Sequence, residues 1–352
     1  MHLTSVRLVG HGPFDDLTLS LADEGEAPRP VTVIFGGGGV GKTSLLGAIA
    51  STRPGLAVAL TTRRPPAGGK PAFAVTTWKL GVDDPARPHP LRVASPNAQL
   101  EEPDDVLLLG RREQALYDRR AVERGSVVLL FSAARWFSRS PLLLTAPERT
   151  VARYDVRAAP NLDDATRGDL TRETKQALSY AAIGAAIGAS AEPSPLQRRL
   201  ADLDATMRQV VTALTSLGGF DYLGADPLTL EPLFSTPGGE PALFDELPTA
   251  MRHLAAFGAL TVRALFAAYP DLPLAQAEGV VLVDELALHQ EPAVERHLLP
   301  ALRTLLPRVQ WVVTTSSTSL VATCEPGELI ALRRTPPSAR VELYEGPLAV
   351  VH

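Results

Sequence analysis

The feature that most constrains the fold of this chain is a glycine-rich segment between an apolar run and a helical pattern. Residues 36–43 read Gly-Gly-Gly-Gly-Val-Gly-Lys-Thr, which fits the pattern G-x-x-x-x-G-K-[ST]. The preceding run, Val31 to Phe35, is rich in β-branched residues and predicts a strand buried in a sheet. Thr43 to Ser51 has the apolar stripe of a helix. Strand, loop and helix together predict a phosphate-binding loop.

The chemistry of such a loop follows from its residue types. Glycines let the backbone wrap a phosphate, while successive N–H groups and the N-terminus of the helix supply positive potential. We expect Lys42 to neutralise the β- and γ-phosphates and the hydroxyl of Thr43 to bind Mg²⁺. The alternative is a flexible glycine-rich turn that binds nothing. The residues expected at the nucleotide are Gly36, Gly37, Gly38, Gly39, Val40, Gly41, Lys42, Thr43 and Ser44.

A second pattern carries acidic chemistry about 240 residues downstream. The apolar run Gly279 to Val283 predicts a buried strand, and it ends in Asp284 and Glu285. In a phosphate-binding protein, Asp284 would help to hold Mg²⁺, and Glu285 would orient or deprotonate an attacking water. Alone, two acids after a strand are also a common way to enter a loop. The phosphate-binding loop makes the catalytic interpretation the better one.

Strand and helix patterns alternate along the chain, which predicts an α/β fold with a mostly parallel sheet. Strand patterns at Ala72 to Leu80 and Leu91 to Ala94 indicate an antiparallel insertion, and helical patterns at Thr171 to Ala189 and Leu196 to Leu217 indicate a small lobe. We expect one domain, 1–352, in five parts. These are 1–52 with the first strands and the phosphate-binding loop, 53–125 the insertion, 126–162 a strand and loop, 163–246 the helical lobe, and 247–352 a long helix, the acidic strand and the last strands.

Composition narrows the function classes. The net charge of −5 argues against a generally basic nucleic-acid binder, although residues 51–160 carry 17 basic and 11 acidic residues, a local balance of +6. That excess fits a solvated surface or, as the minority alternative, a phosphate-binding face. The single cysteine, Cys324, rules out an internal disulfide framework. Without a signal-peptide pattern or an apolar run long enough for a bilayer, we expect a cytoplasmic protein and no membrane contact.

A family resemblance rests on the segment that begins at the two acids. Asp284 to Pro292 reads Asp-Glu-Leu-Ala-Leu-His-Gln-Glu-Pro and resembles the D-E-x-x-L-H-x-x-P segment of the RecF-like and OLD-like, SMC-related branch of ABC-type ATPases. Leu3 to Leu21 resembles the opening strand pair of those heads, and Val309 to Ser319 their last core strand and switch loop. The resemblance implies an ABC-ATPase-like P-loop NTPase head with an antiparallel β subdomain and a small helical lobe. It also implies ATP and Mg²⁺ as cofactors and a homodimer with ATP sandwiched between two heads.

The segment that would contact ATP across the dimer departs from the family pattern. Leu247 to Arg252 stands where the family has its signature, usually a Ser-Gly pair followed by Glu or Gln. Thr249 could replace the hydroxyl and Arg252 could supply charge, whereas Met251 offers no polar group. An ordinary packed helix is the alternative.

Two further segments also depart from the family. Ser316 stands where the switch loop usually has a histidine, and because a serine hydrogen-bonds but carries no charge, slow hydrolysis is expected. A helix cap is the alternative role for this Ser/Thr segment. Phe131 to Arg135 occupies the place of the Q-loop without a glutamine, and Arg135 could face either phosphate or a surface acid.

The leading functional hypothesis is an ATP-dependent switch that controls a partner or nucleic acid. The resemblance implies a setting in DNA repair or phage defence, a separately encoded effector protein, and DNA or RNA as a further partner. A nucleotide-binding scaffold with little or no hydrolysis is the alternative, because Ser316 and Met251 break the catalytic pattern. A phosphotransferase or GTPase is disfavoured, since no Asn-Lys-x-Asp guanine motif occurs.

Overall fold

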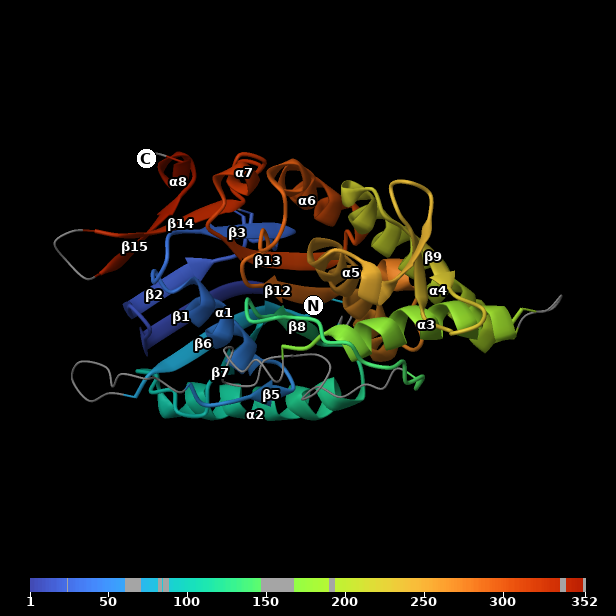
Figure 1. Cartoon of the computed structure of the whole chain (residues 1–352). Coiled ribbons are helices and arrows are strands. Elements are labelled where there is room, and N and C mark those ends of the chain that lie inside the picture. Colours follow the sequence, from blue (N-terminus) through green and yellow to red (C-terminus); the bar gives the residue numbers. More distant parts are fainter. Residues whose placement is uncertain are drawn as a thin grey trace.

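The core of the molecule is a six-stranded sheet whose strands are mostly parallel (Figure 1). A computed structural model of the chain describes residues 1–23, 25–60, 71–81, 84, 89–146, 168–189, 194–335 and 340–350. The sheet runs in the order β15-β14-β3-β13-β12-β8, and only β15, at one edge, is antiparallel to its neighbour. Its strands are β3 (Val31–Phe35), β8 (Val127–Phe131), β12 (Gly279–Val283), β13 (Val309–Thr315), β14 (Leu329–Arg334) and β15 (Val341–Glu345).

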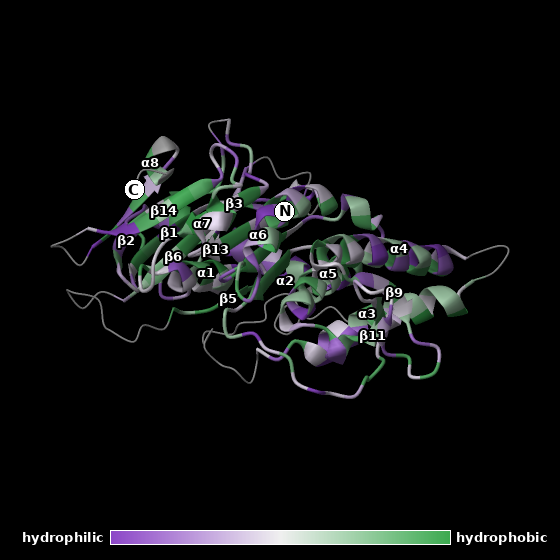
Figure 2. Cartoon of the chain, turned by 45° about the horizontal axis from the view of Figure 1, so that its top comes forward, coloured by the Kyte–Doolittle hydropathy of each residue, from purple (hydrophilic) through white to green (hydrophobic). Residues whose placement is uncertain are grey.

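Both faces of this sheet are covered, which explains why its inner strands are mostly apolar. Every residue of β8, β12 and β13 is buried. Alternate residues enter two separate hydrophobic cores: Val280 and Leu282 face one, Val281 and Val283 the other. Figure 2 shows the contrast between hydrophobic central strands such as β14 and the hydrophilic residues along α4 in the lobe.

The first core lies between the central sheet and an antiparallel sheet of order β2-β1-β6-β7. Helix α1 (Lys42–Ser51) fills the space and contacts β1, β6 and β8. Because β6 pairs directly with β1, the strands expected as an insertion continue the N-terminal strand pair. The antiparallel strands are β1 (His2–His11), β2 (Phe14–Ser20), β6 (Phe73–Lys79) and β7 (Leu91–Ala94), with the short pair β4 (Thr52–Arg53) and β5 (Leu56–Ala57) beside them.

The same region contains a helix that the sequence interpretation missed. Helix α2 (Asp104–Glu123) lies along the edge of the molecule in Figure 1 and contacts β7. Much of its outer surface is exposed, including Leu108, Leu109 and Leu116. An apolar residue on the solvent side breaks the regular stripe by which amphipathic helices are recognised.

The second core joins the central sheet to a lobe formed by α3 (Thr171–Ile187), α4 (Pro195–Thr215) and α5 (Thr249–Ala268). Both expected lobe helices are confirmed. Helix α4 begins with a capping box in which Ser194 and Gln197 bind each other's backbone N–H groups. The lobe also carries a sheet that was not expected, with strands β9 (Asp221–Ala225), β10 (Pro232–Ser235) and β11 (Pro241–Leu243).

Three helices complete the C-terminal third: α6 (Pro292–Leu305), α7 (Thr318–Val321) and α8 (Pro347–Val350). Of the last two strands, β14 pairs in parallel with β3, and β15 pairs antiparallel with β14. Short 3-10 helices lie at Ser216–Gly218, Phe244–Glu246 and Leu274–Gln276.

The α/β fold with a mostly parallel sheet, an antiparallel subdomain and a helical lobe is confirmed. The division into five parts stays a prediction, and its boundary at residues 162 and 163 lies outside the described residues. Among the described helices, none combines the length and the apolar character needed to span a bilayer.

Candidate functional site

The glycine-rich loop connects β3 to α1 and is open at its middle glycines. Gly41, the residue before α1, has a left-handed φ of 96°, and a Cβ there would lie 2.6 Å from Cζ of Phe14. At Gly37, Gly38 and Gly39, by contrast, a Cβ would meet nothing within 4 Å. Helix α1 has no side-chain cap and no acidic residue in its first turn. An uncapped helix N-terminus beside an open glycine loop has the polarity for an anion.

Two residues expected at the nucleotide turn their side chains away from the open side of the loop. Val40 is buried, and its Cγ2 would lie 2.7 Å from a Cβ on Gly36. Ser44 faces the turn between β1 and β2, where a Cβ on Gly12 would lie 2.9 Å from its Oγ. Any contact of Val40 or Ser44 with a phosphate would therefore use the backbone.

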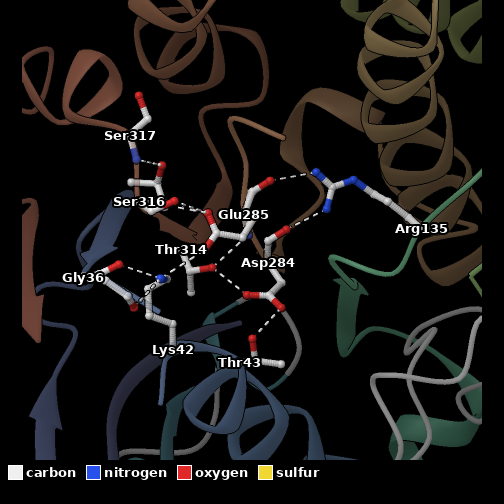
Figure 3. A network of polar contacts seen from close by, with 11 residues as sticks. Gly36, Lys42, Thr43, Arg135, Asp284, Glu285, Thr314, Ser316 and Ser317 are labelled. Carbon is white, nitrogen blue, oxygen red and sulfur yellow. Dashed lines mark hydrogen bonds and ion pairs between the residues drawn. The ribbon is translucent and has the colours of Figure 1, made fainter. Parts of the chain in front are cut away.

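Lys42 lies at the centre of the site with its side chain only 7% exposed. Its Nζ donates to the carbonyl oxygens of Gly36 (2.6 Å) and Gly37 (3.1 Å). It also forms an ion pair with Oε1 of Glu285 at 3.0 Å (Figure 3). The structure thus joins the loop lysine to the acid expected to act on water.

Asp284 accepts hydrogen bonds from two threonines that come from different elements (Figure 3). Thr43 Oγ1 donates to Oδ2 at 2.8 Å, and Thr314 Oγ1 donates to Oδ1 at 2.6 Å. Thr314 is adjacent because β12 and β13 run in parallel, with Val283 opposite Val313. The sequence interpretation gave Thr314 no role, since that adjacency depends on strand order.

The Thr43 hydroxyl and the Asp284 carboxylate fit the chemistry of Mg²⁺, which prefers oxygen ligands. The described residues contain no group of three or more His, Cys, Asp or Glu side chains able to hold a metal. The two oxygens of Thr43 and Asp284 suit Mg²⁺, because this ion is commonly held by one or two protein oxygens with water and substrate phosphates completing the shell.

Glu285 is held in an unusual backbone conformation. Its φ is 50°, in the left-handed region, and its N–H donates to Thr314 Oγ1 at 2.8 Å. Its Oε2 accepts from the backbone N–H of Ser316 at 3.1 Å and from the Ser316 hydroxyl at 3.2 Å. Ser316 therefore lies beside the acid, while the helix-cap role belongs to Ser317, whose Oγ accepts from the N–H of Leu320.

Arg135 is directed to backbone carbonyl groups beside the two acids, not to a surface acid. It is 4% exposed, and its guanidinium donates to the backbone oxygens of Asp284 (2.6 Å) and Glu285 (2.8 Å). Burial lowers the pKa of Arg135 to about 10, and the negative charges of Asp284 and Glu285 act in the opposite direction. The side chain remains charged at neutral pH. Arg135 lies near the acids because β8 pairs with β12, and local sequence patterns do not indicate that pairing.

The signature segment lies at the start of α5, apart from the glycine loop and the two acids. Thr249 is exposed, and Arg252 Nη2 donates to its hydroxyl at 3.4 Å. In the part of the chain that the structure describes, neither side chain hydrogen-bonds to the glycine loop or to the two acids. Met251 is buried against Gly218, where a Cβ would lie 2.4 Å from its Sδ. An inward-facing position explains an apolar residue where the family has Glu or Gln.

Comparison with known proteins gives a likeness of fold. No family model matches the sequence, and no curated protein matches it either. The fold is similar to that of SMC head domains. One example is the SMC head bound to the C-winged helix domain of ScpA, with a TM-score of 0.53, 14% identity, and 98% of this chain and 97% of that chain covered. Another, from Pyrococcus furiosus, is the Smc head with an extended coiled coil bound to the C-terminal domain of ScpA. Its TM-score is 0.51, with 13% identity and with 97% of this chain and 96% of that chain covered.

At these identities the likeness establishes the fold alone. The chain has an ABC-ATPase-like P-loop NTPase fold of the SMC head type, as expected from the sequence. The likeness does not single out the RecF-like or OLD-like branch.

Proposed function

We propose that this chain is an ATPase head that binds ATP with Mg²⁺ and closes around the nucleotide with a second copy of itself. The observation that carries the proposal is the meeting of two distant segments. Thr43 is 2.8 Å from Asp284, and Lys42 is 3.0 Å from Glu285, although about 240 residues separate the partners in sequence. The SMC-type head fold supports the same function.

The contacts of Lys42 suggest how phosphate binding would prepare the site. Among the described residues, the acceptors of its ammonium group are the carbonyl oxygens of Gly36 and Gly37 and the carboxylate of Glu285. A γ-phosphate in the loop would offer a stronger anionic acceptor and draw Lys42 away from Oε1 of Glu285. That oxygen would then be free to accept a proton from the attacking water, while Ser316 holds the other oxygen. Mg²⁺, when bound by Thr43 and Asp284, stabilises the charge that develops on the phosphates.

The start of α5 supplies the proposed contact to the opposite head. Thr249 is exposed, and no side chain caps the helix there. A phosphate held by a second copy would be received by the Thr249 hydroxyl, the free N–H groups of the first turn, and the charge of Arg252. The proposed homodimer therefore uses surface that a single chain leaves open.

For the cellular role, we propose a switch of the RecF-like or OLD-like kind in DNA repair or phage defence. The SMC heads of similar fold were crystallised with a domain of ScpA, a separate protein. For this chain the corresponding partner would be a separately encoded effector protein, with DNA or RNA as a further ligand.

The dimer and the turnover can be tested with two variants. Glu285→Gln should bind ATP but hydrolyse it about 100-fold more slowly, and sedimentation equilibrium should show a dimer that forms only with ATP. Lys42→Ala should lose ATP binding and phosphate release, whereas Lys79→Ala, at an exposed position of β6, should behave as the wild type. A Glu285→Gln protein that stays monomeric at saturating ATP would contradict the sandwich.

A nucleotide-binding scaffold with little hydrolysis is the second candidate. The observation in its favour is that Glu285 Oε2 is held by the uncharged Ser316, where the related switch loop has an imidazole. This candidate predicts tight ATP binding without phosphate release above the Lys42→Ala background. Clear turnover that disappears in Lys42→Ala would exclude it.

A further inference from the structure

The left-handed backbone conformation of Glu285 is held in place by contacts on both sides of its turn. A left-handed φ such as its 50° is unfavourable for a residue with a side chain. On one side of the turn, the N–H groups of Glu285 and Leu286 donate to Oγ1 (2.8 Å) and O (2.9 Å) of Thr314. On the opposite side, the carbonyl groups of Asp284 and Glu285 both point to Arg135 (Figure 3). The peptide groups of this turn are thus fixed from two directions.

The contacts of Arg135 suit it for this task. Nη1 and Nη2 bind two successive carbonyl oxygens, which requires the planar fork of a guanidinium. In the described part of the chain Arg135 forms no ion pair with a carboxylate, and its third acceptor is the carbonyl oxygen of Ser132, at 3.0 Å. A buried charge without a carboxylate partner is costly and calls for a reason beyond packing.

Arg135 is also held by the helix that begins at the signature segment. Its guanidinium lies 5.1 Å from the ring centroid of Phe257, in the middle of α5. That ring packs edge-on against Phe131 of β8, with centroids 4.9 Å apart. The side chain therefore connects α5, β8 and the turn that carries Glu285.

We propose that Arg135 is a positioning residue for hydrolysis. By binding the carbonyl groups of Asp284 and Glu285, it keeps Glu285 in the left-handed conformation that directs one carboxylate oxygen to Lys42 and the other to Ser316. Through Phe257, the same contact makes this alignment depend on the position of α5. The inference rests on the proposed function in naming Glu285 as the acid that acts on water.

The kinetic test uses Arg135→Lys, which keeps the charge but cannot bind both carbonyl groups in the same fork. We expect kcat to fall about 10-fold, the rate equivalent of one lost charge-assisted hydrogen bond, with ATP affinity within threefold of wild type. Arg199→Lys is the matched control. Arg199 also lies over a phenylalanine of α5, Phe266 at 4.0 Å, and donates to its carbonyl group, far along the helix from the acids. It should turn over at the wild-type rate.

A double variant separates positioning from a general structural effect. If Arg135 acts through Glu285, adding Arg135→Lys to Glu285→Gln should change the residual rate by less than twofold. A further 10-fold loss in the double variant would overturn the proposal, because Arg135 would then act independently of Glu285. Should Arg135→Lys fail to fold, Phe257→Leu is the substitute, and it should lower kcat in the same Glu285-dependent way.

A second readout does not depend on ATP hydrolysis. In the nucleotide-free protein, amide hydrogen exchange at Leu286 should be at least about 10-fold faster in Arg135→Lys, while strand β13 keeps its wild-type protection. Unchanged exchange at Leu286 would overturn the positioning role. Faster exchange together with a wild type that neither binds nor hydrolyses ATP would instead overturn the proposed function and leave Arg135 as the residue that shapes this turn.

Discussion

The two regions expected to contact ATP differ in how far one chain completes them. Around Lys42, Asp284 and Glu285, every charged group is already bound by residues of the same chain. At the start of α5, Thr249 is exposed, and the first turn has no side-chain cap. The first region is organised before a ligand arrives, whereas among the described residues no side chain caps the first turn of the second. That difference is what a site shared between two copies would require.

The largest effect is expected from a substitution at the start of α5 that leaves the residues around Lys42, Asp284 and Glu285 unchanged. Thr249→Glu puts a negative charge where the partner's phosphate would lie, so ATP-dependent dimerisation and turnover should fall about 100-fold through charge repulsion and lost contacts. ATP binding by the monomer should stay within threefold of wild type. Nucleotide titration and sedimentation equilibrium measure the two properties separately.

The control for Thr249→Glu is Thr304→Glu, the same substitution at an exposed position of α6. It should dimerise and turn over as the wild type does. If Thr249→Glu also retained the ATP-dependent dimer, the start of α5 would not be the second half of the site.

Only part of the candidate site could be predicted from the sequence. The glycine loop and the acidic pair were predictable because each motif lies in one continuous segment, in a strand and loop context that local patterns indicate. The places of Arg135 and Thr314 were not, since both depend on the order of β8, β12 and β13 in the sheet. Neighbouring strand ends in a parallel sheet bring together residues about 150 apart in sequence, such as Arg135 and Asp284.

Helix α2 and the small sheet of the lobe were missed because local sequence patterns did not indicate them. Helix α2 was missed because its leucines lie partly on the solvent side, and the small sheet of the lobe was missed because its strands are three to five residues long. The sequence marks Met251 as a departure from the family pattern. Its reason, an inward position against Gly218, required the packing of the lobe.

A smaller effect is expected within the organised region. Thr314→Val keeps the shape of the side chain but leaves Asp284 Oδ1 and the N–H of Glu285 without their partner. The free energy of unfolding should fall by about 1–3 kcal/mol, and turnover by about 10-fold, because buried polar groups lose their hydrogen bonds. Chemical denaturation and phosphate release provide the measurements.

Thr32→Val is a matched control for that change. Thr32 lies in β3, two strands from β12, is fully buried, and its hydroxyl is without a partner in the described structure. The same substitution there should be neutral or stabilising, since it removes an unsatisfied polar group. Equal destabilisation by the two variants would mean that the Asp284 network adds nothing specific.

The smallest expected effect is on the free energy of unfolding at acid pH. It comes from a histidine that lies between the two regions. His253 of α5 is fully buried and stacks on His289, with ring centroids 5.2 Å apart. Burial lowers the pKa of His253 to about 3, with the charges of Arg135 and His289 acting in the same direction. Because the unfolded chain binds this proton near the ordinary pKa of about 6.5 and the folded chain does not, stability should be lost as pH falls from about 6.5 to 3.

Replacing this histidine shows how much it contributes to the pH dependence of the free energy of unfolding. In His253→Phe, the free energy of unfolding should depend on pH less steeply in that window, by at most about 1.4 kcal/mol per pH unit. A slope will remain, since burial also lowers the pKa of His2 to about 4. The control His297→Asn, at an exposed position of α6, should keep the wild-type slope. If His253→Phe kept it too, the imidazole would already be protonated in the folded state, and the packing between α5 and the turn after Glu285 would have to accommodate a buried charge beside Arg135.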